Sequence, residues 1–299
     1  MSAEIIIRAF GDYYAPVGGA PPDVRELSKQ TLGKQVRRVG RFIQLALIGA
    51  ARCVGAETPP AHTAIYMSSR RGDLETNIEV LEQLFAHAQS PKPLSFINTV
   101  SNASCYYVAR HFGLHGRSCF VTGVCFGFEM ALQAALLDFQ AGQVSSALAG
   151  GLDTLAAPLD VDRRRLGVPA DAAIGEASHW LWLESRAPAP GDMVLDAVEA
   201  FADRAAALAW LKGKRFDPEK TLLAAGQYLS PADAAAAQTE AGISRTFAYR
   251  EGRAHYDGQA GAALSAFKDE PSLDGCTLAH LNGDTEGRYA VFVARRIRA

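Results

Sequence analysis

The chain has 299 residues, of which 48% are hydrophobic and 21% are charged. This balance is ordinary for a globular protein and excludes a disordered or collagen-like chain. The 30 basic and 32 acidic residues leave a net charge of −2, so no overall basic field favours nucleic acid as a partner. The length suits two domains or one large α/β unit, with a core that needs no disulfide or structural metal.

Hydropathy and cysteine spacing restrict the compartment and the cofactors. The longest apolar stretch, residues 42–54, is interrupted by Arg52, and a membrane span needs about 20 apolar residues. No signal-peptide pattern opens the chain, so we expect a cytoplasmic protein with reduced thiols. None of the five cysteines forms a CxxC pair and no nucleotide-binding motif occurs, so we expect neither a metal nor a bound cofactor.

In the first half, short β-rich runs alternate with helical runs. Strands are predicted over 5–9, 63–67, 118–122, 145–149 and 179–184, helices over 36–53, 74–88, 105–112 and 128–141, and a connector over 95–100. The helix over 128–141 is apolar on nearly every side except at Glu129, Gln133 and Asp138, which predicts burial in a large core. The alternation indicates βαβ units and a mainly parallel sheet.

A loop rich in Pro and Gly, residues 186–191, breaks this pattern. We place a boundary there, with halves 1–188 and 189–299. The order then restarts, with strands over 193–198, 221–225, 246–249, 277–281 and 289–294 and helices over 205–211, 231–241 and 258–267. The second half repeats the first at low fidelity. Each half therefore presents one reactive residue between a strand and a helix, Cys125 in the first and His255 in the second.

Both residue types suit covalent catalysis, and both have ordinary structural explanations. Cys125 precedes a buried helix, where the helix dipole and free N–H groups favour a thiolate, lower the thiol pKa and can hold an oxyanion. The alternative is a small buried hydrophobe, because free Cys is among the most buried residue types. His255 could act as an acid, a base or a donor to a carbonyl oxygen, or be an ordinary surface histidine in a turn.

Several motifs together resemble one family. The run 121–125 (VTGVC) resembles the V-T-x-A-C nucleophile motif of the β-ketoacyl synthases of the thiolase superfamily. Residues 149–151, 175–184 and 255–262 resemble that family's A-G-G, G-E-G-A…L-V-L-E and G-H-x-x-G-A-A-G motifs. The segment 90–103 resembles ketosynthase-like proteins of aryl polyene and related type II polyketide pigment clusters. The resemblance covers most of the chain and is strongest over about residues 90–185.

The resemblance implies a thiolase-like α/β fold, in which two similar βαβαβ halves stack their sheets around a buried central helix layer. It also implies acyltransferase chemistry in fatty acid or polyketide biosynthesis. Cys125 would hold the acyl group as a thioester, and His255 would polarise a malonyl thioester while CO₂ leaves. The implied partners are acyl carrier protein, whose phosphopantetheine arm belongs to the substrate, or acyl-CoA. Family members pair through a central strand, so a homodimer or a heterodimer with another ketosynthase is expected.

The chain departs from the elongating ketosynthases in two places. The stretch over 223–227 lacks the histidine of their H-G-T-G-T motif, and the C-terminal G-F-G-G loop is absent. The shorter length looks more like the priming type III synthases, which use Cys, His and Asn. That resemblance implies Asn282, at the end of a predicted strand, as the third catalytic residue. Asp284 is an alternative, and an ordinary Asn-Gly turn is the structural explanation.

Three functions therefore stay open. A condensing or acyl-transferring enzyme is favoured by the retained Cys125. A non-catalytic partner similar to a chain-length factor, or an acyltransferase unable to decarboxylate, is favoured by the two missing motifs. A thioester hydrolase on the same fold would need water at the acyl enzyme. Arg163–Arg165 is a candidate dock for an acidic carrier protein, or a solvated loop beside Asp160 and Asp162.

Overall fold

The structure is a computed structural model that describes residues 3–18, 22–34, 36–123, 125–155 and 158–299. Val124, part of the predicted nucleophile turn, lies outside these ranges. The hydrogen-bonded strand order is β3-β2-β4-β5-β1-β6-β10-β9-β7-β8. The strands are β1 (Glu4–Val17), β2 (Ala64–Ser69), β3 (Ser118–Thr122), β4 (Ser146–Asp153), β5 (Ile174–Arg186), β6 (Met193–Phe201), β7 (Thr221–Ala225), β8 (Arg245–Thr246), β9 (Thr277–Gly283) and β10 (Tyr289–Arg296).

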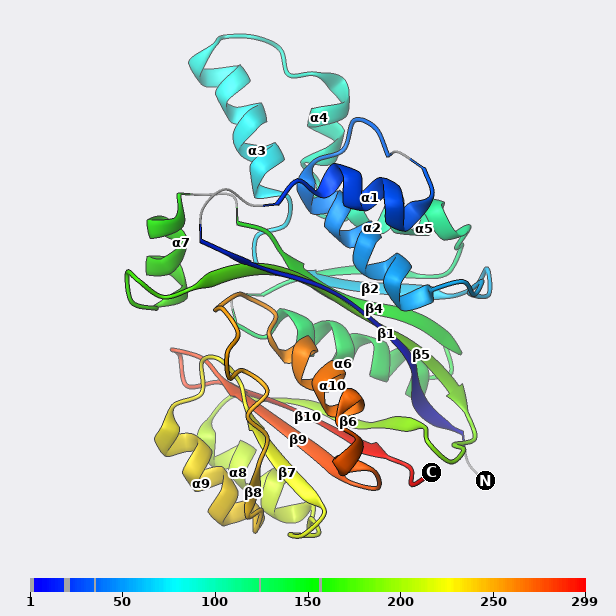
Figure 1. Cartoon of the computed structure of the whole chain (residues 1–299), viewed down its shortest axis with the longest axis vertical. Coiled ribbons are helices and arrows are strands. Elements are labelled where there is room, and N and C mark those ends of the chain that lie inside the picture. Colours follow the sequence, from blue (N-terminus) through cyan, green and yellow to red (C-terminus); the bar gives the residue numbers. More distant parts are fainter. Residues whose placement is uncertain (1–2, 19–21, 35, 124, 156–157) are drawn as a thin grey trace.

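Helices cover and separate the strands in five alternating layers (Figure 1). α1, α2 and α5 cover the sheet of β1–β5, α6 and α10 lie between the sheets, and α8 and α9 cover the sheet of β6–β10. The helices are α1 (Val24–Leu32), α2 (Arg41–Val54), α3 (Leu74–Leu81), α4 (Pro93–Asn98), α5 (Ala103–Phe112), α6 (Gly127–Gln140), α7 (Leu159–Leu166), α8 (Arg204–Gly213), α9 (Pro231–Ala241) and α10 (Ala260–Asp269), with a π-turn η1 (Glu82–Ala86) and a 3₁₀ turn η2 (Pro271–Leu273).

The two halves of the strand order repeat one pairing pattern. From β3 to β1, successive neighbours pair parallel, parallel, antiparallel and antiparallel, and the same sequence runs from β8 to β6. Among the described strands, the ladders of the two halves join only through β1 and β6, at Ile6↔Val194 and Ile7↔Met193. The two sheets therefore stack over α6 and α10 instead of forming one flat sheet (Figure 1). The expected division at residues 188/189 falls in the turn 187–192 between β5 and β6, and the division of the chain into halves 1–188 and 189–299 stays a prediction.

The central helices are buried as their composition predicts. Phe128, Leu132 and Leu136 of α6 and Leu264 and Phe267 of α10 are all at most 4% exposed, because sheets cover these helices from both sides. α10 approaches β5 closely at Gly261, where a Cβ would lie 2.6 Å from the Cβ of His179. Only glycine permits this approach without displacement. Within the described ranges, no helix combines the length and apolar character needed to cross a membrane.

Several sequence-based boundaries were wrong. The expected connector over 95–100 forms most of α4, which begins with Pro93 at its first position, where a missing N–H costs little. The helix expected to start at residue 36 begins at Arg41, after an extended Gly40. The helix over 74–88 ends at Leu81 and continues as a π-turn. Of the strand expected over 246–249, only Thr246 lies in a strand, the two-residue β8. α1 and α7 were not predicted at all.

Candidate active site

Cys125 lies between β3 and α6 and is half-buried. It lines two cavities of about 20 Å³ and 10 Å³, each about the space of one water molecule. Burial raises the pKa of the Cys125 thiol; Asp284 and Asp257 raise it further, whereas Arg70 lowers it. The expectation of a lowered thiol pKa at this helix terminus was therefore wrong, because desolvation of the thiolate outweighs the nearby cation.

Asn282, at the end of β9, lies directly beside Cys125. Its Nδ2 donates to the carbonyl oxygen of Cys125 at 3.4 Å and to Oε1 of Glu129 at 3.0 Å. Its Oδ1 accepts from the backbone N–H groups of Tyr228 at 3.3 Å and Gly283 at 3.1 Å. Gly226 leaves the room for this amide, since a Cβ there would lie 2.3 Å from the Asn282 side chain. All hydrogen-bonding positions of the amide are thus used by the protein.

Glu129 and His280 extend this arrangement beneath the cysteine. Burial raises the pKa of Glu129 to about 7, with the Asn282 hydrogen bond opposing the rise. The Nδ1 atom of His280 lies 3.9 Å from Glu129 Oε1 and has no hydrogen-bond partner in the described structure, while Nε2 lies 3.0 Å from Tyr249 Oη. Burial lowers the pKa of His280 to about 3, so its ring is neutral. Sequence reasoning noted Glu129 only as a polar residue on an apolar helix.

His255 lies in the segment between β8 and α10 and is half-buried. Its backbone N–H donates to Ala173 at 2.8 Å, and its carbonyl accepts from Gly175 at 2.9 Å. It lines neither cavity at Cys125, although Asp257 and Gln259, close behind it in the chain, do. Burial, with a contribution from Arg250, lowers the pKa of His255. The structure therefore brings Cys125 and Asn282 together without His255, whose catalytic role stays a proposal.

Asp284, the alternative third residue, closes the turn between β9 and β10. Its carboxylate accepts from the backbone N–H groups of Glu286 and Arg288 and from Nε of Arg288 at 2.7 Å. Burial is the largest single influence and raises the pKa of Asp284, but these hydrogen bonds together outweigh it, so the pKa lies below its ordinary value. The carboxylate is thus ionised and committed to the turn, and it acts on Cys125 only through its charge.

The run Arg163–Arg165 lies on α7, not on the expected solvated loop. Arg163 donates to the carbonyl of Ala172. Arg164 is 71% exposed and pairs with Asp160. Arg165 is only 17% exposed and reaches the carboxylates of Asp162 and Asp257. The candidate dock therefore reduces to one exposed arginine, whereas Arg165 belongs to the surroundings of the Cys125 cavity.

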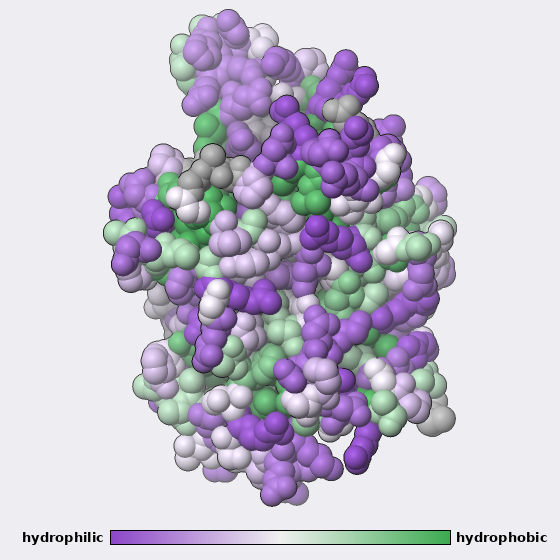
Figure 2. Space-filling view, viewed as in Figure 1, coloured by the Kyte–Doolittle hydropathy of each residue, from purple (hydrophilic) through white to green (hydrophobic). Residues whose placement is uncertain are grey.

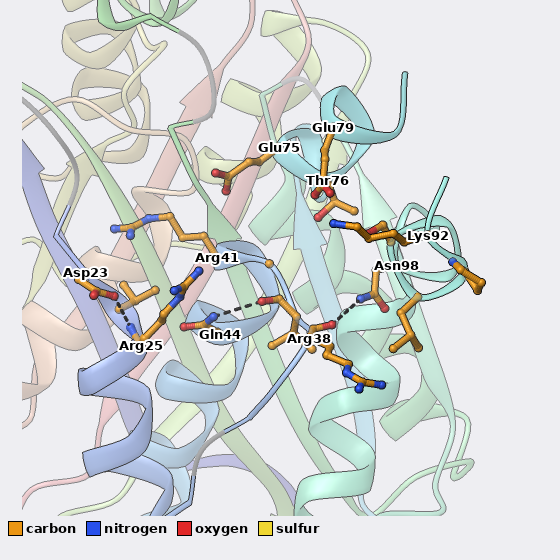
Figure 3. A pocket seen from close by; sticks show the side chains of 16 residues that line it. Asp23, Arg25, Arg38, Arg41, Gln44, Glu75, Thr76, Glu79, Lys92 and Asn98 are labelled. Carbon is orange, nitrogen blue, oxygen red and sulfur yellow. Dashed lines mark hydrogen bonds between the residues drawn. The ribbon is translucent and has the colours of Figure 1, made fainter. Parts of the chain in front are cut away.

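A larger cavity lies away from the cysteine, where hydrophilic residues dominate the surface over α1 and α3 (Figure 2). It measures about 1050 Å³ and lies among α1, α2, α3 and α4. Figure 3 shows charged side chains around it, including Arg25, Arg41 and Glu75, while Gln44 and Asn98 donate to the backbone of residues 39 and 38. It shares no lining residue with the Cys125 cavities, and its charged walls do not suit an acyl chain.

No group of three or more His, Cys, Asp or Glu side chains among the described residues could hold a metal ion.

The family described as Beta-ketoacyl synthase, N-terminal domain, matches residues 7–165. This chain belongs to the β-ketoacyl synthase family. A search of curated protein sequences finds no match.

Solved ketosynthase structures share the fold of this family member over its whole length. The ishigamide ketosynthase/chain length factor matches with a TM-score of 0.76 and 17% identity, covering 98% of this chain and 99% of that one. A type II polyketide synthase acyl-carrier protein in complex with its ketosynthase matches at 0.73 and 12% identity, covering 99% and 100%. The 3-oxoacyl-(acyl carrier protein) synthase III of Pseudomonas aeruginosa matches at 0.61 and 14%, covering 99% of each. The thiolase-like α/β fold predicted from sequence is thereby confirmed.

Proposed function

We propose that this ketosynthase-family chain is an acyltransferase that holds an acyl group as a thioester on Cys125. The observation that carries the proposal is the position of Cys125 between β3 and α6, with Asn282 bonded to its carbonyl. The thiolate would attack the carbonyl carbon of an acyl thioester, the bond to the carrier sulfur would break, and the carrier thiol would leave with the proton. Fatty acid or polyketide synthesis on an acyl carrier protein is the process that such a transfer serves.

His255 and Asn282 complete the proposed catalytic set in different ways. Asn282 would position the nucleophile, because its amide joins the Cys125 carbonyl to Glu129. His255 would donate to the carbonyl of a malonyl thioester, which requires its side chain to reach a cavity that it does not line here. The contacts around Cys125 therefore support acyl transfer, whereas decarboxylative condensation also needs a movement of His255.

The test is covalent. Intact-mass analysis after incubation with acyl carrier protein or acyl-CoA thioesters of several chain lengths should show one acyl adduct. The adduct should persist in Cys119→Ala, which removes the other half-buried thiol, and vanish in Cys125→Ala. Adding malonyl-carrier protein then separates condensation from simple transfer, and release of free acid would indicate a hydrolase. No adduct with any thioester would overturn the enzymatic proposal.

A non-catalytic partner role is the second candidate, and exposed apolar side chains favour it. Leu81, Phe85, Phe96, Ile97 and Tyr106, on α3 to α5, are 52–82% exposed, and large apolar groups gathered at a surface mark interfaces. β3 lies at the end of the strand order, with β2 as its one strand neighbour among the described residues, so its outer edge can pair with another chain. We propose that this edge and these helices meet a second ketosynthase-family chain.

Co-expression with a full-length ketosynthase tests the partner role. A stable heterodimer in analytical ultracentrifugation, combined with no acyl adduct on Cys125, would favour the second candidate. A homodimer that forms an adduct would favour the first. The expected pigment pathway, aryl polyene or related, rests on the resemblance of segment 90–103 alone and enters here as the proposed context.

A further inference from the structure

Glu129 is a carboxyl group buried beside Cys125. It is 1% exposed, and it lines the cavity of about 10 Å³ together with Cys125. Asn282 joins the two residues, because its Nδ2 donates to Glu129 Oε1 at 3.0 Å and to the Cys125 carbonyl at 3.4 Å. A space of this size suits one water molecule. Cys125 and Glu129 are thus separated by a space that a single water can bridge.

Three further polar atoms around this cavity have no hydrogen-bond partner in the described structure. They are Nε2 and Oε1 of Gln227 and Oε1 of Gln259, and both residues line the cavity. Gln259 is 5% exposed, and its Nε2 donates to the Ala254 carbonyl at 2.9 Å. Buried polar atoms are almost always hydrogen-bonded, and a buried water typically makes about three such bonds. The cavity therefore suits a water molecule between Cys125 and Glu129.

We propose that Glu129 takes the proton of the Cys125 thiol through one water molecule that Gln227 and Gln259 hold in this cavity. The S–H bond breaks and its proton passes to the water, while a proton of the same water passes to a carboxylate oxygen of Glu129. The thiolate then forms its bond to the acyl carbon, and the bond to the carrier sulfur breaks. The carrier thiolate takes the proton back from Glu129, which is thus a general base and then a general acid.

Most other ionisable groups around the cavity do not compete for this proton. The titratable and charged groups that face Cys125, Glu129 or their direct neighbours from other elements are Arg70, Tyr228, Tyr249, Arg250, Tyr256, Asp257, His280, Asp284 and Arg288. Burial raises the pKa values of the three tyrosines, so they stay neutral. Burial lowers the pKa of His280 to about 3, which is too low for a base at neutral pH. Burial raises the pKa of Glu129 to about 7, which suits a group that accepts and returns a proton.

Asp153 is the one competitor among the described carboxyl groups that line the Cys125 cavities. It lines the cavity of about 20 Å³, and burial, followed by Asp257, raises its pKa to about 7. It belongs to a charge cluster over this cavity, in which Arg70 and Arg165 both pair with Asp257. Asp153 Oδ1 already accepts from a serine hydroxyl at 2.7 Å and from the backbone N–H of Arg70 at 2.9 Å. Asp153 is therefore the comparison residue in the test.

The pH dependence of alkylation tests the role of Glu129 without any acyl carrier. Iodoacetamide loses iodide to the cysteine sulfur, and peptide mapping reports the rate at Cys125. In the wild-type chain the rate should rise as pH passes about 7, where Glu129 loses its own proton and can accept another. In Glu129→Gln the rise should move above pH 9, because burial keeps the thiol pKa above its ordinary value of 9.0. The rate at pH 7.5 should then fall at least about tenfold.

The sign of the change separates a base from a charge. A glutamate that acted only through its negative charge would disfavour the thiolate, so Glu129→Gln would then speed alkylation. Gln227→Leu removes two of the unpartnered polar atoms and should slow the reaction at pH 7.5 while Glu129 stays in place. This second variant decides the matter if Glu129→Gln exposes the buried Cys53 to alkylation, which would mark misfolding. An unchanged or faster rate in either variant, or no rise near pH 7 in the wild-type chain, would overturn the proposal.

Asp153→Asn is the matched control, because it makes the same carboxyl-to-amide change at a second buried group whose pKa is about 7. It should leave the rise near pH 7 in place, and loss of the rise would overturn the assignment to Glu129. The inference rests on the proposed role of Cys125 as acyl acceptor. If no thioester gives an adduct while Glu129→Gln shifts the alkylation profile, only the proposed function falls. If an adduct forms and the profile does not shift, only the role of Glu129 falls.

Discussion

Each half has a strand followed by a connection to a central helix, and the two halves differ in the length of that strand's pairing and of the connection. In the first half, β3 pairs with β2 over five residue pairs and leads through Cys125 into α6. In the second half, β8 pairs with β7 over two pairs, and residues 247–259 intervene before α10. The family match covers residues 7–165 and stops short of the second half. Cys125, the proposed nucleophile, therefore lies within the matched range, and its predicted partner His255 lies outside it.

This difference predicts unequal effects of two substitutions. Cys125→Ala should abolish the acyl adduct completely, because no other thiol occupies that turn. His255→Ala should leave the adduct intact and reduce only the malonyl-dependent step, since His255 lines neither cavity at Cys125. Intact mass measures the first step and product analysis the second. Equal loss of the adduct in both variants would break the comparison.

Glu129 should give the largest effect on stability. Its folded pKa of about 7 lies above the ordinary value of 4.5, so the folded chain binds the extra proton and loses stability as pH rises from about 4.5 to 7. The full effect is about 3 kcal/mol. Glu129→Gln should remove this loss, so urea unfolding at pH 8 should show the variant gaining relative to wild type. His280, whose pKa is lowered to about 3, has the opposite trend below pH 6.5, so the variant and wild type are compared at pH 8, where this histidine is neutral in both the folded and the unfolded chain. Parallel stability–pH curves would contradict this account.

Asn282→Ala should destabilise the chain by about 2 kcal/mol, because it leaves Glu129 and the N–H of Tyr228 buried without their partner. Chemical denaturation at pH 7 measures this. Asn282→Asp keeps the size but places a second carboxylate against Glu129, so it should be at least as harmful. If Asn282→Ala were as stable as wild type, the hydrogen bond of 3.0 Å from Asn282 Nδ2 to Glu129 Oε1 would not contribute to stability.

The smallest effect on stability belongs to the surface of the first half. Phe85 is 82% exposed, so Phe85→Asp should change the free energy of unfolding by less than about 0.5 kcal/mol. It should instead weaken association with a second ketosynthase-family chain, measured by sedimentation. Lys214→Asp, on an exposed position of the second half, is the control and should leave association unchanged. Unaltered association of Phe85→Asp would place the interface elsewhere.

Local signals determined the elements that sequence reasoning placed correctly. β7 and α9 agree residue for residue with the expectation, because Ser230 caps α9, Pro231 begins it and Gly242 ends it. α4 and α7 have only six and eight residues, too few for a periodic pattern. β1 extends to Val17 because it pairs with β5 along its whole length, which no local pattern reveals.

Local patterns also failed to reveal part of the candidate site. The family motif marked Cys125, and resemblance indicated Asn282. Glu129 joins the site through a partner 153 positions away, and Arg70 meets Asp257 across 187 positions. Such contacts follow from the stacking of the halves and leave no spacing in the sequence. The charge cluster over the cavity was therefore visible only as an arginine run and a histidine motif.

The junction between β1 and β6, only two residue pairs long, has a consequence for chemistry at a distance. Cys125, the proposed nucleophile, belongs to one half, and Asn282 and Asp257 belong to the other, so the boundary between the halves runs through the candidate site. Small changes in the relative position of the two sheets should therefore alter the reactivity of Cys125 without unfolding the chain. Alkylation of this one thiol in Ile7→Ala, a truncation at the seam, would measure the fit of the two halves.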